Sequence, residues 1–216
     1  MIIAKQSNAK TVVVVDLPPI AYAVQQLLQG EEGLQFGGAF ARSVAYEEIA
    51  KVSPALIVAD IFYTDGSPTD FIRNLCEIVP SARILVWSAG EDVWGARALR
   101  VGAKGFLSKH SPMSELVIAM RQVLSGLAYA SNSVKDYLVR RACDGAGNVY
   151  SQLSEREAEV FHYLGSGKST RQVAHTLRLS VKTVESHRAH IKKKLGLRNA
   201  TELLTAAIQW RSNGST

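Results

Sequence analysis

Apolar and polar residues alternate in short blocks along the first 126 residues of the chain. Short apolar runs, typical of buried strands, are separated by stretches in which apolar residues recur with helical spacing. The predicted strands cover residues 11–16, 34–40, 55–60, 82–88 and 104–108. The predicted helices cover residues 19–29, 43–52, 69–78, 92–101 and 113–124. This alternation predicts an α/β fold, a doubly wound five-stranded parallel sheet with helices on both faces.

The pattern from residue 150 onward predicts helices alone. Three serines stand where helix caps are expected, and these are Ser154, Ser169 and Ser180. The helices predicted after the caps cover residues 155–164, 170–177 and 181–195, and a last helix covers 199–210. Glu157 completes a capping box with Ser154, and Gly165 and Gly167 end the first of these helices. The close spacing of these helices predicts a small all-α helix-turn-helix domain.

The helix over residues 181–195 divides into two faces when residues are spaced at about 100°. One side is apolar and consists of Val184, Ile191 and Leu195. The opposite side carries Lys182, Ser186, Ala189 and Lys193, and its edges carry Glu185, His190 and Lys192. The outer face is basic, and its other side chains are short or polar, as the major groove of DNA requires.

A charged helix can also be the solvated side of an ordinary helical bundle, and Lys192-Lys193-Lys194 alone fits that interpretation. The full set of caps, glycines and spacings over residues 153–204 resembles the C-terminal domain of LuxR-type regulators of the NarL/FixJ family. The resemblance implies binding to double-stranded DNA. It implies base contacts from Glu185, Ser186 and Ala189. The implied phosphate contacts come from Thr170, Arg171, Lys182, Arg188, Lys192 and Lys193.

Charge is distributed unevenly along the chain. Residues 150–216 contain 11 Lys and Arg against 5 acidic residues, whereas residues 1–149 contain 14 of each. The whole net charge of +6 therefore lies in the C-terminal third. Such a basic region attracts phosphates, and its affinity for nucleic acid falls as the salt concentration rises. It does not by itself select a nucleotide sequence.

Four groups suited to phosphoryl chemistry follow the predicted strands. Ligands gather at the carboxyl ends of strands in a parallel sheet. Asp16, Asp60, Ser88 and Lys109 are all expected at that edge. Two carboxylates can hold a divalent cation, while a hydroxyl and an ammonium group can neutralise phosphoryl oxygens. Taken singly, an Asp at a strand end is more often a turn or helix cap, and a surface Lys is usually solvated.

The order of these groups and the segment Gly-Ala-Lys-Gly-Phe-Leu-Ser-Lys over 102–109 resemble the receiver domain of bacterial two-component response regulators. The resemblance implies that Asp60 is the phosphoacceptor of a partner histidine kinase. Ser88 and Lys109 would sense the phosphoryl group, and Phe106 would be the switch aromatic. Mg²⁺ would be held by Asp16, Asp60 and the backbone carbonyl of Phe62.

The chain departs from the receiver pattern at the end of the first strand. Leu17 stands where receivers carry a second acid, and this loss should weaken Mg²⁺ binding because the ion needs well-placed oxygen ligands. His110 also replaces an acid or proline, and residues 61–66 lack the usual proline. Two interpretations stay open. Either Asp60 is phosphorylated with a weaker metal site, or control comes from constitutive dimerisation, a protein partner or a ligand near Phe62, Tyr63 and Trp87.

The predicted organisation is a receiver-like domain over residues 10–126, a linker over 127–149 with one helical stretch near 134–142, and a helix-turn-helix domain over 150–212. In LuxR-type regulators the last helix also pairs two DNA-binding domains, so we expect a homodimer. Cys76 and Cys143 have neither metal-ligand nor redox spacing, and no apolar run is long enough to span a membrane. We therefore expect a cytoplasmic protein.

The expected function is transcriptional regulation rather than enzyme activity. Two other binding proteins fit parts of the pattern, namely a ligand-sensing regulator of the quorum type and a partner-binding adaptor without specific DNA binding. The first is disfavoured because the N-terminal alternation resembles a receiver domain. An enzyme of flavodoxin-like fold is disfavoured because no glycine-rich phosphate loop follows the first strand.

Overall fold

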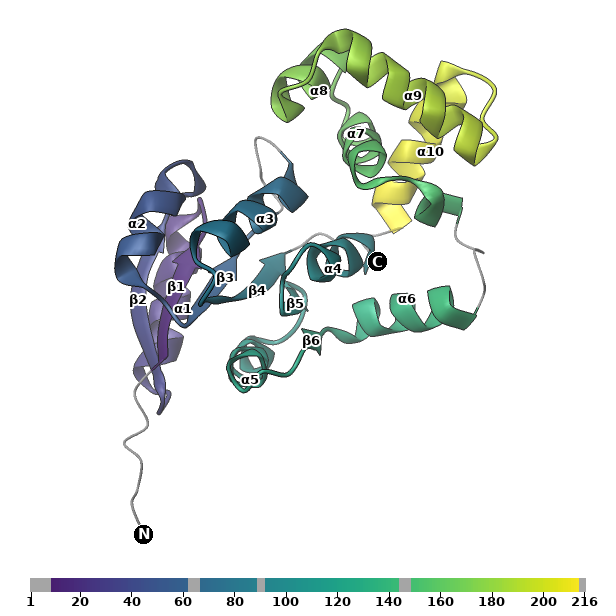
Figure 1. Ribbon diagram of the computed structural model, residues 1–216. Coiled ribbons are helices and arrows are strands. Elements are labelled where there is room, and N and C mark those ends of the chain that lie inside the picture. Colours follow the sequence, from purple (N-terminus) through teal and green to yellow (C-terminus); the bar gives the residue numbers. More distant parts are fainter. Residues whose placement is uncertain (1–8, 62–66, 89–91, 144–148, 214–216) are drawn as a thin grey trace. The chain divides into compact units, whose positions relative to one another are not determined.

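A computed structural model of the protein describes residues 9–61, 67–88, 92–143 and 149–213 (Figure 1). The chain divides into two compact units. The first unit comprises residues 1–63, 72–89 and 98–131, and the second comprises residues 64–71, 90–97 and 132–216. None of the helices in the described ranges is long and apolar enough to cross a membrane.

The described residues of the first unit form a parallel sheet with the strand order β2-β1-β3-β4-β5-β6. Its strands are β1 (Ala9–Val14), β2 (Leu34–Phe40), β3 (Leu56–Ala59), β4 (Arg83–Ser88), β5 (Gly105–Ser108) and β6 (Tyr129–Ala130). Every neighbouring pair is parallel, as predicted from the alternation of apolar runs and helices. The sequence predicts five strands, whereas the sheet has six. Because β6 contains two residues, it is too short to give a pattern of alternation.

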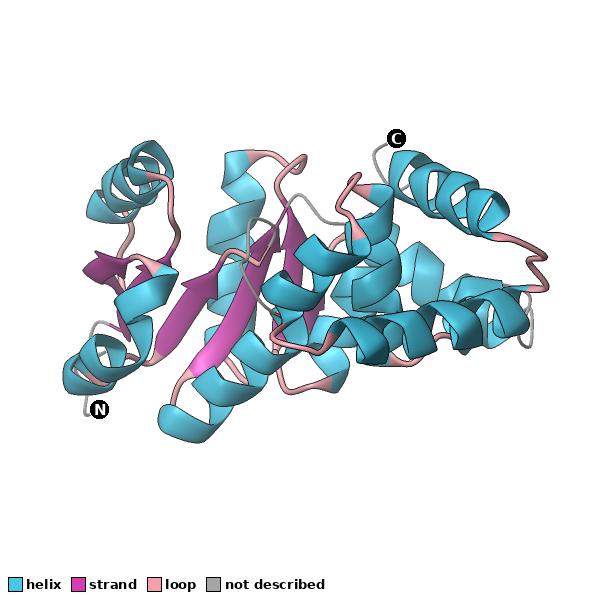
Figure 2. Cartoon of the chain, turned by 90° about the horizontal axis from the view of Figure 1, so that it is seen from above, coloured by secondary structure: helices cyan, strands magenta, loops and turns pink. Residues whose placement is uncertain are grey.

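Helices cover both faces of this sheet, as the magenta strands and cyan helices of Figure 2 show. The helices of this unit are α1 (Pro18–Gln29), α2 (Ala45–Val52) and α5 (Met113–Leu124), with the 3₁₀ turn η1 (Arg42–Val44) before α2. The unit also includes residues 72–78 of α3 (Pro68–Ile78) and 98–100 of α4 (Asp92–Arg100), whereas the first residues of both helices belong to the second unit. The bounds of α1 to α5 lie within two residues of the predicted ones. Proline at the first position of α1 suits a helix start, where its missing N–H has no intrahelical partner to lose.

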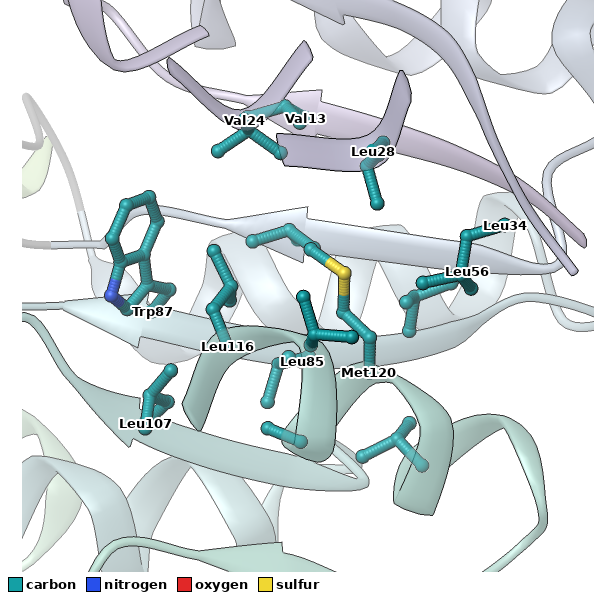
Figure 3. Close-up of a cluster of buried hydrophobic side chains, with 14 of the residues drawn as sticks. Val13, Val24, Leu28, Leu34, Leu56, Leu85, Trp87, Leu107, Leu116 and Met120 are labelled. Carbon is teal, nitrogen blue, oxygen red and sulfur yellow. The ribbon is translucent and has the colours of Figure 1, made fainter. Parts of the chain in front are cut away.

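A core of hydrophobic side chains lies between the sheet and helices α1 and α5 (Figure 3). Val24 and Leu28 of α1, and Leu116 and Met120 of α5, are all nearly or fully buried there. Side chains alternate between the two faces along each strand, so the buried residues at the intervening strand positions point to the opposite face. Burial on both faces explains why the strands read as continuous apolar runs.

The second unit contains helices α6 (Asn132–Cys143), α7 (Glu155–Gly165), α8 (Thr170–Leu177), α9 (Val181–Leu195) and α10 (Ala200–Asn213), with the 3₁₀ turn η2 (Val149–Gln152) before α7. Figure 1 draws the ribbons of α7 to α10 in green to yellow. Ser154, Ser169 and Ser180 each cap a helix by accepting a backbone N–H from the residue three positions later. The predicted capping box of Ser154 and Glu157 is present, and Ser169 forms a second box with Gln172.

Gly165 has a different role from the one that the sequence suggests. It is the last residue of α7, and a methyl group on its Cα would overlap the backbone carbonyl of Ala207 in α10. Glycine at this position therefore allows two helices to approach closely, rather than only ending the first one. Gly167, which follows α7, has a φ of 83° and so adopts the left-handed backbone conformation that commonly ends a helix.

Candidate functional site

Helix α9 presents a polar and basic face because its apolar side is fixed in a core. Val184 and Ile191 are fully buried, and Leu195 packs against the same cluster. Lys182, Glu185, Ser186, Ala189 and Lys193 are all exposed. The predicted division of the helix into two faces is confirmed, and the open face combines cationic groups with short side chains that permit close approach to a groove.

A hydrogen bond joins α9 to the start of α8. The Arg188 guanidinium donates to the Thr170 hydroxyl over 2.6 Å, and Arg171 beside it is exposed. This bond brings together two of the predicted phosphate-contacting residues from different helices. The guanidinium has further donors, which leaves it able to bind a phosphate oxygen beside Thr170.

The three consecutive lysines of α9 are not equivalent. The Lys194 ammonium donates to a carboxylate oxygen of Glu157 over 2.6 Å, and the Glu157 side chain is 5% exposed. Burial alone would raise the pKa of Glu157, but hydrogen bonds from Lys194 and Ser154 lower it overall. The Lys194 side chain is also exposed, at 38%, but its charge is engaged by Glu157, whereas Lys193 is exposed and Lys192 half-buried. Sequence periodicity did not identify the Glu157–Lys194 ion pair because its members are 37 residues apart.

His187 lies between the buried and exposed sides of α9. Burial lowers the pKa of its imidazole, and nearby Arg156 and His190 lower it further against the opposite effect of Glu157 and Glu159. The ring is therefore neutral near pH 7. It adds no charge to the basic face at that pH.

The receiver-like unit brings Asp60 and Lys109 together at the carboxyl edge of its sheet. Asp60 follows β3 and donates its backbone N–H to the Val14 carbonyl, while Lys109 follows β5 and donates its backbone N–H to the Ser88 carbonyl. The Lys109 ammonium forms an ion pair with the Asp60 carboxylate, and the two side chains are 14% and 8% exposed. Lys109 also lies 5.7 Å from the ring centre of Trp87.

Ser88 and Phe106 lie on the two strands beside this ion pair. Ser88 ends β4 and Phe106 is in β5, and both are fully buried. In the sheet register Phe106 lies between Val86 and Ala130. His110 is exposed, and its backbone N–H donates to the Ser108 hydroxyl over 3.2 Å. Phe62 and Tyr63 lie outside the described residues.

The third predicted metal ligand, Asp16, already has a cationic partner. One carboxylate oxygen accepts the backbone N–H of Arg42 at 3.0 Å, and the other accepts its guanidinium at 3.1 Å. Leu17 is the N-cap residue of α1 and is 45% exposed. Receiver domains typically bind Mg²⁺. Here, two carboxylates face two cations beside an apolar residue, so these residues do not fit a Mg²⁺ site as they are arranged.

Sequence and structure comparisons place the chain among known regulators. A family described as "Bacterial regulatory proteins, luxR family" matches residues 151–207. The Fimbriae Z protein of Escherichia coli (strain K12) is 29% identical over 202 residues, which are 91% of this chain and 95% of that protein. The Fimbriae Z protein of Salmonella typhimurium (strain LT2) is 31% identical over 153 residues, or 70% of this chain and 73% of that protein.

The fold is also that of a solved response regulator. RcsB from Salmonella enterica serovar Typhimurium, bound to promoter rprA in the presence of phosphomimetic BeF₃⁻, superposes with a TM-score of 0.73 and 22% identity. The superposition covers 93% of this chain and 98% of that chain. Proteins of this family are transcriptional regulators rather than enzymes. The chain belongs to the LuxR family of bacterial regulatory proteins, as a response regulator that joins a receiver domain to a C-terminal helix-turn-helix domain.

Proposed function

We propose that this protein binds promoter DNA by inserting α9 into the major groove. The exposed face of α9 carries the argument, because Lys182 and Lys193 can contact phosphates at its two ends while the short side chains between them approach base edges. RcsB, which shares the fold, has been solved on promoter DNA. Arg188, Thr170 and Arg171 would supply further phosphate contacts where α8 begins, and Lys192 would supply another from α9.

The hydrogen bonding of α9 suggests which base edges it reads. The Ser186 hydroxyl donates to the Lys182 carbonyl over 3.1 Å, so while this bond persists Ser186 can only accept from a base. Glu185 is also an acceptor, and Ala189 offers a methyl group. In the major groove the donors are the amino groups of cytosine and adenine, and thymine offers a methyl group. We expect a site enriched in these features opposite the three residues.

The proposed DNA-binding form is a homodimer. Helix α10 buries Leu203 and Ala207 in its own domain, whereas Leu204 and Ile208 are 43% and 47% exposed. Two adjacent apolar side chains on an exposed helix can pack against the same residues of a second copy in an isologous contact. A dimer would read two half-sites related by symmetry.

Selection from a random duplex library tests the DNA-binding proposal. Full-length protein should enrich a sequence with two half-sites, and Glu185→Ala should relax the preference at one base position in each half-site. Arg198→Gln, in the turn between α9 and α10, removes one positive charge as a control and should leave the selected sequence unchanged. Binding without sequence preference at low salt would instead favour the adaptor function.

We further propose that the receiver domain controls this binding in the cytoplasm, with Asp60 accepting a phosphoryl group from a histidine kinase. The Asp60–Lys109 ion pair supports this role, since Lys109 can move from the carboxylate to a phosphoryl oxygen. The alternative is control without phosphorylation, by a ligand, a protein partner or constitutive dimerisation. The pairing of Asp16 with Arg42 favours this alternative, because both oxygens of the carboxylate that would bind the metal in an ordinary receiver already accept hydrogen bonds from Arg42.

Intact mass after incubation with acetyl phosphate separates the two modes of control. Transfer to Asp60 releases acetate and adds one phosphoryl group, and this gain should disappear in Asp60→Asn. The reaction should be run with and without Mg²⁺. No mass gain, also with candidate histidine kinases as donors, together with retained DNA binding, would assign control to a ligand, a partner or dimer concentration.

A further inference from the structure

Asp16 and Arg42 meet because of the register between two neighbouring strands. Val14 pairs with Phe40 at the carboxyl ends of β1 and β2, and the Val15 N–H donates to the Phe40 carbonyl over 3.0 Å. Asp16 and Arg42 each lie two residues beyond this last pair. Parallel strands end at the same edge of a sheet, so the register alone places an acid and a guanidinium side by side.

Arg42 engages Asp16 in two ways that support each other. Its backbone N–H, at the first residue of η1, donates to one carboxylate oxygen at 3.0 Å. Its guanidinium donates to the other oxygen at 3.1 Å. The Arg42 side chain is 13% exposed, whereas that of Asp16 is 43% exposed. The arginine is thus held in place by the protein, while Asp16 serves both as the cap of a short turn and as one half of an ion pair.

The same edge of the sheet carries a second ion pair, between Asp60 and Lys109. We propose that Arg42 is an internal counterion that takes the position of a divalent cation beside Asp16. A metal ion would have to displace a guanidinium from one oxygen and a backbone N–H from the other before Asp16 could coordinate it. Mg²⁺ is a poor competitor in such an exchange, because it gives up its hydration shell reluctantly and usually binds through one or two free carboxylates.

This role of Arg42 goes beyond the proposed function and does not depend on whether Asp60 is phosphorylated. It makes Arg42, together with Leu17, a determinant of metal specificity. An acid at position 17 would add one ligand, but Asp16 would remain engaged by Arg42. Removal of Arg42 would release Asp16 for metal binding. The two changes should therefore reinforce each other, since each supplies a ligand that the other lacks.

A double-mutant cycle on the full-length protein tests the proposal with Mn²⁺ as the probe. Mn²⁺ takes the same oxygen ligands as Mg²⁺, and the electron paramagnetic resonance signal of the free ion disappears when the ion binds. The cycle compares the wild type, Leu17→Asp, Arg42→Met and the double variant. We expect Arg42→Met to tighten Mn²⁺ binding about tenfold, from the loss of one adjacent positive charge. The double variant should gain more than the product of the single changes.

Matched variants separate this effect from a general change in charge. Arg121→Met removes an arginine that pairs with Glu31 at 2.8 Å in the same unit, and it should leave Mn²⁺ affinity unchanged. Arg42→Lys keeps the charge and should bind Mn²⁺ as weakly as the wild type. Asp16→Asn in the Arg42→Met background should abolish the gain. If Arg42→Met fails to fold, as judged by circular dichroism, Arg42→Gln takes its place in the cycle.

Two results would overturn the proposal. One is an Arg42 variant, folded and lacking the positive charge, that binds Mn²⁺ no more tightly than Arg121→Met. The other is a Leu17→Asp variant that reaches the affinity of the double variant while Arg42 is intact. Either result would mean that Arg42 does not compete with the metal for Asp16. The phosphorylation assay with acetyl phosphate is independent of both outcomes.

Discussion

The two regions that carry charge in this protein use their cations in opposite ways. On α9, Lys182 and Lys193 are exposed, and the interior acid Glu157 is neutralised by a separate lysine, Lys194. At the carboxyl edge of the sheet, Arg42 and Lys109 are each paired with an aspartate of the same unit. The first arrangement leaves positive charge available to a partner, whereas the second neutralises its own carboxylates.

The difference shows that the number of charges says little about what a surface can bind. The N-terminal 149 residues have no net charge and the C-terminal 67 have all of it. The cations on α9 belong to a surface to which anions can be attracted at long range. The paired groups of the receiver unit instead act over short distances, where removing one partner leaves the other uncompensated.

The largest effect is expected where helix packing holds the basic face in place. Gly165→Ala should destabilise the C-terminal helices by about 3 kcal/mol, because the added methyl group overlaps the Ala207 backbone. Differential scanning calorimetry of the full chain would measure the loss. Gly30→Ala is the control, since no atom lies within 4 Å of the added group and the φ of Gly30 is −95°. Equal unfolding temperatures for the two variants would contradict this account of Gly165.

The next effect concerns the internally paired cations. Lys109→Met should destabilise the receiver unit by about 2 kcal/mol, because the Asp60 carboxylate is left largely buried without its partner. Lys51→Met removes an equally charged lysine from the exposed ion pair with Glu48 and should change stability little. Denaturant unfolding followed by circular dichroism would compare them. A similar loss in both variants would remove the distinction between buried and exposed pairs.

The contrast within α9 can be tested by comparing two neighbouring lysines. Lys193→Gln should weaken DNA binding about tenfold and reduce the slope of log affinity against log salt by about 0.9, as expected for one lost phosphate contact. Lys194→Gln removes the same charge but should leave the salt slope almost unchanged, because Lys194 is paired with Glu157. Fluorescence anisotropy at several salt concentrations gives both slopes. Equal salt slopes for Lys193→Gln and Lys194→Gln would show that the ion pair with Glu157 does not keep Lys194 from contacting a phosphate.

The smallest expected effect is a pH dependence of stability. The pKa of Glu157 is lower in the folded protein than its ordinary value of 4.5, so its ion pair stabilises the fold above that pH. This stabilisation should be lost as the pH falls below 4.5 through the lower folded pKa. The difference in unfolding free energy between wild type and Glu157→Gln should therefore be present at pH 7 and shrink as the pH falls below 4.5. A difference that does not vary with pH would assign the contribution of Glu157 to packing.

Much of the fold could be predicted from local features of the sequence. Ser154, Ser169 and Ser180 mark helix starts by a chemistry that acts over three residues, and the two faces of α9 follow from its own periodicity. The positions of Asp60 and Lys109 at strand ends likewise follow from apolar runs and the parallel topology. The proximity of Asp60 and Lys109 was predictable because the carboxyl ends of parallel strands lie at the same edge of a sheet.

Contacts set by strand register and helix approach could not be predicted. Arg42 is 26 residues from Asp16, and nothing in its local sequence distinguishes it from a solvated arginine. The register of β1 and β2 decides that it faces an acid. Gly165 reads as a helix terminator until the close approach of α10 is known. Lys194 looks equivalent to Lys193 until Glu157 is placed against it.

Strand β6 affects how the protein can associate with itself. Tyr129 and Ser131 donate their backbone N–H groups to the carbonyls of Lys104 and Phe106 and so cover the edge of β5. An uncovered edge is a template on which further chains add strands, whereas an edge strand of two residues offers few free groups. A homodimer of the proposed kind would therefore form through side chains on helices rather than by the addition of strands at this edge.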